Sequence, residues 1–295
     1  MLHLLDLHFL NRANTIASFL LETEDGPYLF ETGPYSTYSY LTSALKEKGY
    51  APGDIRKVFL THIHLDHAGA AWALAAEGAT VYVHPQGYKH LQDPSKLMAS
   101  ATRIYGDEMD RLWGRMEAIP MENLQAVAHE QVFPTQEYLI KAWHTPGHAV
   151  HHIAWQVNDV LIAGDVAGVK IGQGPVVPPC PPPDIHIEFW QHSIELMRQL
   201  TLNTLFLTHY GAIEKAAIPA HLDALEAELL SWANWIKPYY DQQADPDWLT
   251  PKFQAFVQDA LVKRGVDAAD LELYENANPS WMSVAGLLRY WSKKG

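Results

Sequence analysis

Four candidate metal ligands stand within six consecutive residues of this chain. The stretch from Thr61 to Ala70 reads THIHLDHAGA, and it follows the apolar run Val58-Phe59-Leu60, which is typical of a buried strand. Histidines can be ordinary core or surface residues, and a single pair would mean little. Burying four such groups without partners would be strongly unfavourable, and a bound metal ion would offset that cost.

One short loop cannot complete the coordination of two metal ions, so further ligands are expected elsewhere in the chain. His148 lies in the motif HTPGH, Asp165 in AGD and His209 in THYG. Each residue comes at or just beyond the end of a strand-like run, where loops gather and build sites. The sequence therefore predicts one composite site.

The donor atoms restrict the choice of metal. Imidazole and carboxylate groups suit zinc, iron, manganese or cobalt, and these motifs contain no thiolate. Five His and two Asp are about the right number for two divalent ions that share one carboxylate. Such a site lowers the pKa of bound water towards neutrality. We expect zinc first, with iron, manganese and cobalt as alternatives.

Taken together, the four motifs resemble those of the metallo-β-lactamase superfamily. They are HxHxDH at 62–67, HTPGH at 144–148, AGD at 163–165 and THYG at 208–211. The resemblance covers roughly residues 1–212. It implies an α/β fold, a four-layer αβ/βα sandwich. We accordingly expect a metallo-β-lactamase-fold domain over 1–212 and a helical C-terminal extension over 213–295, packed on it.

The resemblance also implies a role for each ligand. Its first metal would be bound by His62, His64 and His148, its second by Asp66, His67 and His209, and Asp165 would bridge the two. Asp66 and Asp165 would be the catalytic residues. Gly69 would let the helix after the first motif pack closely.

Four further residues are candidates for contacts with the ligands or the substrate. Glu31 begins Glu-Thr-Gly where the family usually has Asp-Thr-Gly. His151 could orient a ligand, and Tyr210 could donate to a developing oxyanion, although a structural role is the alternative for both. Gly168 stands where acyl-homoserine lactonases of the family often place Tyr.

The motifs favour one branch of the superfamily. Asp165 does not match the Cys ligand of common β-lactamases, and His64 does not match the Glu of flavodiiron proteins. What remains resembles the glyoxalase II and lactonase-like hydrolases. The implied function is a binuclear metal-dependent hydrolase in which a metal-bridging hydroxide cleaves a lactone or thioester of a small molecule. The alternatives are a phosphodiester or phosphonate hydrolase on the same site, and a non-catalytic metal-binding protein.

Composition limits the partners. The 295 residues include 21 basic and 34 acidic side chains, for a net charge of −13. This charge argues against a nucleic acid and against an anionic membrane as partner. The start of the chain lacks the basic region of a signal peptide, and no run of eighteen apolar residues occurs. A cytoplasmic protein with a small-molecule substrate is therefore expected.

The C-terminal third reads as mostly helical. We expect helices over 217–240, 251–264 and 279–292, and a mixed, mainly helical segment over 94–118. The aromatic run over 231–240 packs either on the sandwich or on a second subunit, so a homodimer is an expectation. Two readings apply equally to the proline-rich loop over 166–184. It forms a hydrophobic wall for an acyl group, or it packs on the C-terminal helices.

Overall fold

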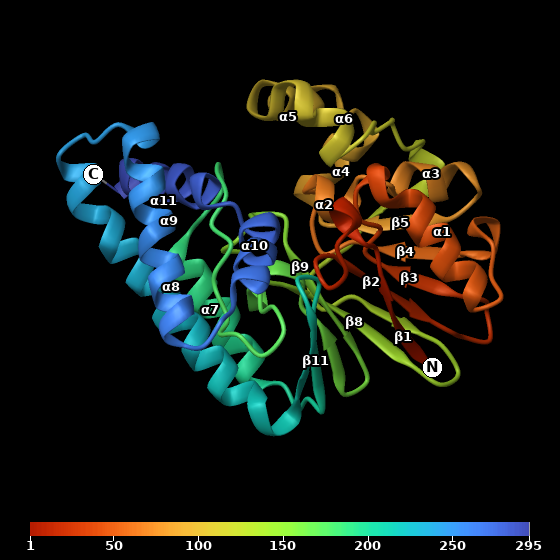
Figure 1. The fold of residues 1–295 in the computed structure, drawn as a ribbon. Coiled ribbons are helices and arrows are strands. Elements are labelled where there is room, and N and C mark those ends of the chain that lie inside the picture. Colours follow the sequence, from red (N-terminus) through yellow and green to blue (C-terminus); the bar gives the residue numbers. More distant parts are fainter. Residues whose placement is uncertain (295) are drawn as a thin grey trace. The chain divides into compact units, whose positions relative to one another are not determined.

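The computed structural model describes residues 1–294 of the chain. The chain forms two compact units (Figure 1). The first contains Met1–His144 and Ile153–Ile162, and the second contains Thr145–His152 and the chain from Ala163 onward. The division into domains over 1–212 and 213–295 stays a prediction.

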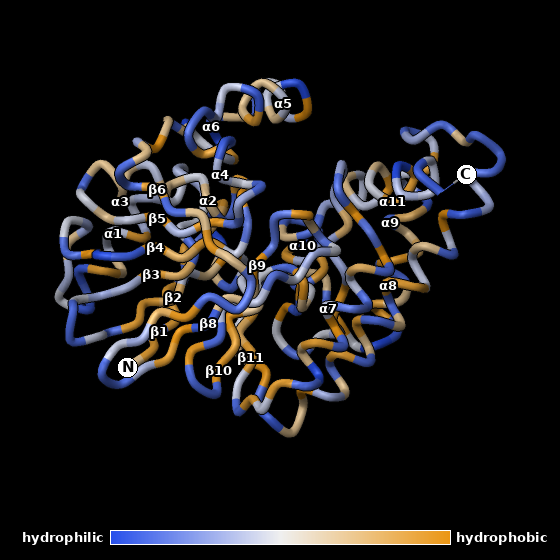
Figure 2. Tube along the Cα trace, turned by 180° about the vertical axis from the view of Figure 1, so that it is seen from behind, coloured by the Kyte–Doolittle hydropathy of each residue, from blue (hydrophilic) through white to orange (hydrophobic). Residues whose placement is uncertain are grey.

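The first unit contains a six-stranded mixed sheet. Its strands are ordered as they occur in the sequence: β1 (Leu2–Asp6), β2 (Ala17–Leu21), β3 (Tyr28–Phe30), β4 (Lys57–Phe59), β5 (Thr80–Val83) and β6 (Leu124–Ala126). Strands β1 to β3 pair antiparallel, and β3 to β6 pair parallel. Every residue of β2 and β3 is buried, and Figure 2 shows hydrophobic residues along both strands. Burial on both faces explains why these strands read as continuous apolar runs.

Four more strands of the first unit pair antiparallel in sequence order. They are β7 (Val132–Pro134), β8 (Leu139–His144), β9 (Ile153–Val157) and β10 (Val160–Ile162). Strand β8 precedes His148 and β10 precedes Asp165, in agreement with the strand-like runs expected before these two residues. Strand β7 was not predicted, because it is short and largely exposed and ends in Pro134. A proline in a strand is typical of a sheet edge.

Aromatic side chains join these two sets of strands inside the first unit. The ring of Phe59 on β4 lies 4.8 Å from that of Trp155 on β9 and 5.4 Å from that of Phe133 on β7, between centroids. Each such pair contributes about 0.5–1.5 kcal/mol beyond area burial. Trp155 Nε1 also donates to the Leu60 carbonyl at 2.9 Å. This bond gives the Leu60 carbonyl a hydrogen-bond partner at a position just beyond the end of β4 and directly before the first motif.

The helices of the first unit share a buried apolar core with its first sheet. They are α1 (Tyr38–Glu47), α2 (Leu65–Ala68), α3 (Ala71–Ala76), α4 (Pro85–Gln92), α5 (Ser95–Tyr105) and α6 (Met109–Leu112). The last two confirm that the segment over 94–118 is mainly helical. Trp113, which follows α6, stacks on Phe9 with 5.5 Å between ring centroids, and Met109 and Met116 are buried. These contacts give the segment a packing role.

The described part of the second unit contains the β11–β12 hairpin and the five helices α7 to α11. Its elements are α7 (Ile187–Gln199), β11 (Thr204–Leu207), β12 (Gly211–Glu214), α8 (Ile218–Asp241), α9 (Pro246–Lys263), α10 (Ala268–Ala277) and α11 (Ser280–Lys294). Helix α11 packs on α8 and α9, and α7 packs on α8 (Figure 1). The helical C-terminal region is therefore confirmed. Among residues 1–294, no helix combines the length and the apolar character needed to cross a membrane.

Two details of this region differ from the expectation. Helix α9 starts at Pro246 rather than at residue 251, because the Asp245 carboxylate caps it and accepts from Asp247 N and Trp248 N. Helix α10 was not predicted as a separate helix. It starts after Asp267, whose carboxylate accepts from Asp270 N at 2.9 Å.

His84 caps the N-terminus of α4 with its side chain. Its Nδ1 accepts from Gln86 N at 3.1 Å, and its ring lies 4.1 Å from that of His144 between centroids. Burial lowers the pKa of His84 from 6.5 to about 4, and the neighbouring His144 adds to the effect. The folded state therefore holds His84 neutral.

The lowered pKa of His84 predicts an acid-dependent loss of stability. Because the unfolded chain takes up this proton near pH 6.5, the contribution is full above that pH and is lost as pH falls towards about 4. The His84→Asn variant keeps a capping acceptor but does not titrate. Its free energy of unfolding in urea should fall less between pH 7 and pH 5 than that of the parent. The exposed His90→Asn variant is the control, and equal losses in all three proteins would contradict the assignment.

Candidate metal centre

The first motif occupies the turn between β4 and α3. His62 and His64 lie on extended chain directly after β4, with φ −61° and ψ 152° at His64, and Asp66 and His67 lie in the short helix α2. At Gly69, a Cβ atom would lie 2.4 Å from the Leu65 carbonyl oxygen and 2.9 Å from Pro34 Cα. A side chain at residue 69 would therefore collide with the backbone at Leu65 and Pro34.

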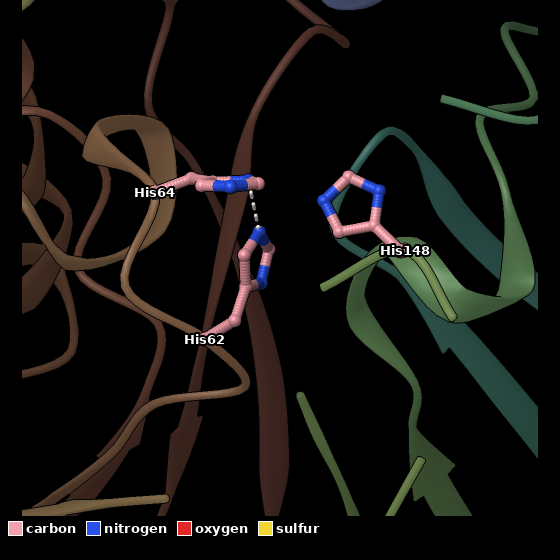
Figure 3. Close-up of side chains that lie close together, drawn as sticks. All are labelled: His62, His64 and His148. Carbon is pink, nitrogen blue, oxygen red and sulfur yellow. Dashed lines mark hydrogen bonds between the residues drawn. The ribbon is translucent and has the colours of Figure 1, made fainter. Parts of the chain in front are cut away.

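The four side chains of this motif lie close together. His62 Nε2 is 2.9 Å from His64 Nδ1 (Figure 3), and His67 Nε2 is 3.7 Å from Asp66 Oδ2. The rings of His62 and His67 are 4.0 Å apart between centroids. Both of these histidines are fully buried, whereas Asp66 is partly exposed. Asp66 is thus the carboxylate of this group that solvent can reach.

Glu31 holds this motif from the end of β3. Its Oε2 is 3.1 Å from His67 Nδ1, and its Oε1 accepts from Thr61 N at 3.0 Å. The carboxylate is fully buried, and the residue has φ 62°, which is unusual for a residue other than glycine. Glu31 therefore orients the ring of His67, the role expected of the Asp that is usual at this position. The contact of Glu31 with Nδ1 directs Nε2 of His67 towards a metal.

The second unit supplies three further candidate ligands. Asp165 lies in a short 3₁₀ helix, Gly164–Ala167. Its Oδ2 is 3.4 Å from His148 Nε2, and its Oδ1 is 3.5 Å from His209 Nε2. All three side chains are almost completely buried. Each imidazole nitrogen thus faces a different oxygen of one carboxylate.

Side chains of two helices bind the backbone carbonyls of the turn that carries Asp165. Trp190 on α7 donates from Nε1 to the Val166 carbonyl at 2.7 Å, and His221 on α8 shares a 2.8 Å bond between its Nε2 and the Ala167 carbonyl. Burial lowers the pKa of His221, which favours the neutral ring. The sequence does not mark His221 as functional, because it shows no ligand spacing and contacts a backbone carbonyl.

His148 is oriented by the proline-rich loop. Its Nδ1 lies 2.9 Å from the Pro179 carbonyl oxygen. Gly147 packs directly against α7, because a Cβ at this position would lie 2.3 Å from Trp190 Cα. The ring of His148 is therefore fixed with Nε2 towards Asp165.

The remaining candidates occupy different surroundings. His151 is buried in the same loop as His148, and the backbone N–H of Tyr210 donates to the Lys170 carbonyl at 3.3 Å. Gly168 has φ 84°, and a Cβ there would lie 2.6 Å from Val176 Cγ2 and 2.8 Å from Leu225 Cδ1. This backbone has no room for a tyrosine at residue 168. Cys180 is buried, which raises the pKa of its thiol, so it is not an activated nucleophile.

The donor set fits divalent metal ions. All seven predicted ligands belong to groups of His and Asp side chains that could hold a metal ion. Two donors that each lie about 2.1 Å from one tetrahedral ion are about 3.4 Å apart. The distances from Asp165 to His148 and His209 match this spacing. In His62, His67 and His148, Nδ1 contacts a protein oxygen and leaves Nε2 as the donor.

The chain belongs to the metallo-β-lactamase superfamily, because the sequence pattern of that family matches residues 12–209. This match contains all seven predicted ligands and confirms the fold class. A metallo-beta-lactamase family protein of Thermus thermophilus has the same fold, with a TM-score of 0.68 at 19% identity. That alignment covers 100% of this chain and 94% of the other. Helices α8 to α11 follow the matched segment.

Two curated relatives are similar over parts of the chain. A metallo-beta-lactamase fold-containing protein of Sulfurisphaera tokodaii is 29% identical over 56% of this chain and 64% of its own length. A thioesterase of Emericella nidulans is 31% identical over 38% of this chain and 24% of its own length. The chain thus spans less than two thirds of either relative.

Replacing Glu31 by Gln should weaken metal binding. The amide oxygen can still accept from Thr61 N, but its NH₂ group then faces His67 Nδ1, which pushes the histidine proton to Nε2. Loss of such a contact typically costs about 10–100-fold in metal affinity. Zinc affinity measured by competition with a chelator should fall accordingly, and it should not change in the exposed Glu47→Gln control. An unchanged affinity in Glu31→Gln would show that this carboxylate does not orient a ligand.

Proposed function

We propose that this protein is a binuclear metal-dependent hydrolase that cleaves an ester-type bond of a small molecule. The observation that carries the proposal is Asp165, whose two carboxylate oxygens face His148 Nε2 and His209 Nε2 at 3.4 and 3.5 Å. A buried carboxylate in this arrangement suits a ligand shared by two ions. Membership of the metallo-β-lactamase superfamily supports the same reading.

The ligands divide between two ions as the motifs imply. One ion would be held by His62, His64 and His148, the other by Asp66, His67 and His209, and both by Asp165. When bound, two divalent ions make hydroxide available near neutral pH and polarise an oxygen of the substrate.

The side chains have separate tasks in this reaction. Glu31 and the Pro179 carbonyl accept a hydrogen bond from Nδ1 of His67 and His148, so that each ring presents Nε2 to a metal. Asp66 is the partly exposed carboxylate of the first motif. Its Oδ1 can take up a proton and pass it to the leaving group, which is general acid–base catalysis.

A lactone or a thioester is the proposed substrate class. The similarity to the fungal thioesterase supports a thioester, although it covers only part of both chains. The tyrosine that acyl-homoserine lactonases often use has no room at Gly168, which also favours the thioester. Zinc is the proposed metal, because imidazole and carboxylate ligands in an open site suit it.

A phosphodiester substrate receives less support. A basic side chain beside the metal site would favour it, but Lys170 Nζ donates to the Gly172 carbonyl in its own loop at 2.8 Å. Burial also lowers the pKa of this amine. The net charge of −13 further disfavours a polyanionic substrate.

The proposal is tested by hydrolysis of a panel of acyl thioesters and aliphatic lactones by the zinc-loaded protein. Asp165→Asn should reduce kcat/KM by about 100-fold or more, and the exposed Asp159→Asn should leave it unchanged. Because Asn keeps the shape of Asp, a fall would reflect the lost carboxylate. Turnover that persists in Asp165→Asn would reject the assigned site. A zinc-loaded parent that cleaves bis(p-nitrophenyl) phosphate but no ester of the panel would reject the substrate class.

A further inference from the structure

The loop that orients His148 has almost no hydrogen-bond donors of its own. Residues 178–183 read PPCPPP, and proline lacks a backbone N–H. Cys180 N is therefore the sole backbone donor in this run. A loop of this kind cannot fix its carbonyl groups through internal backbone bonds, so external partners must place the Pro179 carbonyl.

Those partners come from the junction of α10 and α11. Asn278 Nδ2 donates to the Pro178 carbonyl at 3.2 Å, and Cys180 N donates to Ser283 Oγ at 3.4 Å. The two side chains are joined to each other, because Ser283 Oγ donates to Asn278 Oδ1 at 3.2 Å. The residues on both sides of Pro179 are thus held by one buried pair.

The same loop is in direct contact with these helices elsewhere. A Cβ at Gly286 would lie 2.0 Å from the Cys180 carbonyl oxygen, so the backbone of α11 touches the loop. Tyr274 on α10 donates its hydroxyl to the Pro175 carbonyl at 2.6 Å. The proline-rich loop therefore packs on the C-terminal helices, which confirms one of its two predicted roles.

From this chain of contacts we infer that Asn278 and Ser283 are positioning residues for the metal ligand His148. The inference rests on the proposed function. The pair fixes Pro178 and Cys180, these fix the Pro179 carbonyl, and that carbonyl holds Nδ1 of His148 at 2.9 Å. Nε2 is then left as the metal donor. The C-terminal helices, which lie outside the family match over 12–209, thereby act on the metal site.

A purely structural role makes a different prediction. A buried hydrogen bond stabilises the fold wherever it lies. Ser280 in the same helix offers a comparison, because it is also buried and donates its hydroxyl to Glu275 Oε2 at 2.7 Å on α10, rather than contacting the loop backbone as Ser283 does. Loss of either serine hydroxyl should lower stability, and only loss of the Ser283 hydroxyl should change metal binding.

The test compares Ser283→Ala and Asn278→Ala with Ser280→Ala in the full chain. We expect zinc affinity, measured by chelator competition, to fall about tenfold in the first two variants and to stay unchanged in Ser280→Ala. A nitrogen-correlated NMR spectrum of the zinc-loaded protein should show His148 with its proton on Nδ1 in the parent, and a broadened or shifted Nδ1 signal in Ser283→Ala. Ser283→Ala removes one oxygen without a large cavity, so it serves if Asn278→Ala does not fold.

The outcomes separate this inference from the proposed function. Equal zinc affinities and equal His148 signals in Ser283→Ala and Ser280→Ala would overturn the positioning role. Zinc binding by the parent without hydrolysis of any substrate would overturn the proposed function alone. A parent that binds no zinc would overturn both.

Discussion

A histidine that is to bind a metal from inside a protein must have its second nitrogen occupied, and this constraint explains much of the structure. His62, His67 and His148 each contact a protein oxygen through Nδ1, supplied by Thr61, Glu31 and Pro179 respectively. These contacts fix the ring and leave Nε2 as the donor. The position of these oxygens is set in turn by the surrounding chain. Glu31 lies directly after β3 with φ 62°, and Asn278 and Ser283 contact the residues on either side of Pro179.

The sheets provide the rigidity that such positioning needs. Phe59 and Trp155 pack together inside the first unit, and Trp155 Nε1 binds the Leu60 carbonyl. The first motif therefore begins directly after a strand whose end is fixed by Trp155, through ring packing and through a hydrogen bond. In the second unit, Trp190 and His221 bind the carbonyls of Val166 and Ala167 around Asp165. A ligand carried by a turn is thus fixed by two helices that contribute no ligand themselves.

The sequence predicted those parts of the molecule whose signals are local. Apolar runs located β4, β9 and β11, and ligand spacing located the candidate metal ligands. Parts that depend on tertiary contacts were not predictable. His221 and Asn278 bind backbone carbonyls distant in sequence, and no spacing rule marks such residues. Strand β7 and helix α10 carry weak patterns, and the predicted start of α9 at residue 251 lies inside the observed helix, which begins at Pro246. The lack of space at Gly168 depends on Val176 and Leu225, which only the folded chain brings near.

The central claim is that one chain binds two metal ions through the seven predicted ligands. The most direct measurement is the number of zinc ions per chain, determined by native mass spectrometry during a zinc titration of the metal-free protein. The account predicts saturation at two ions for the parent and loss of at least one ion in His209→Ala, since His209 is proposed as a ligand of the second ion alone. Saturation at one ion or none in the parent, or two retained ions in His209→Ala, would contradict it.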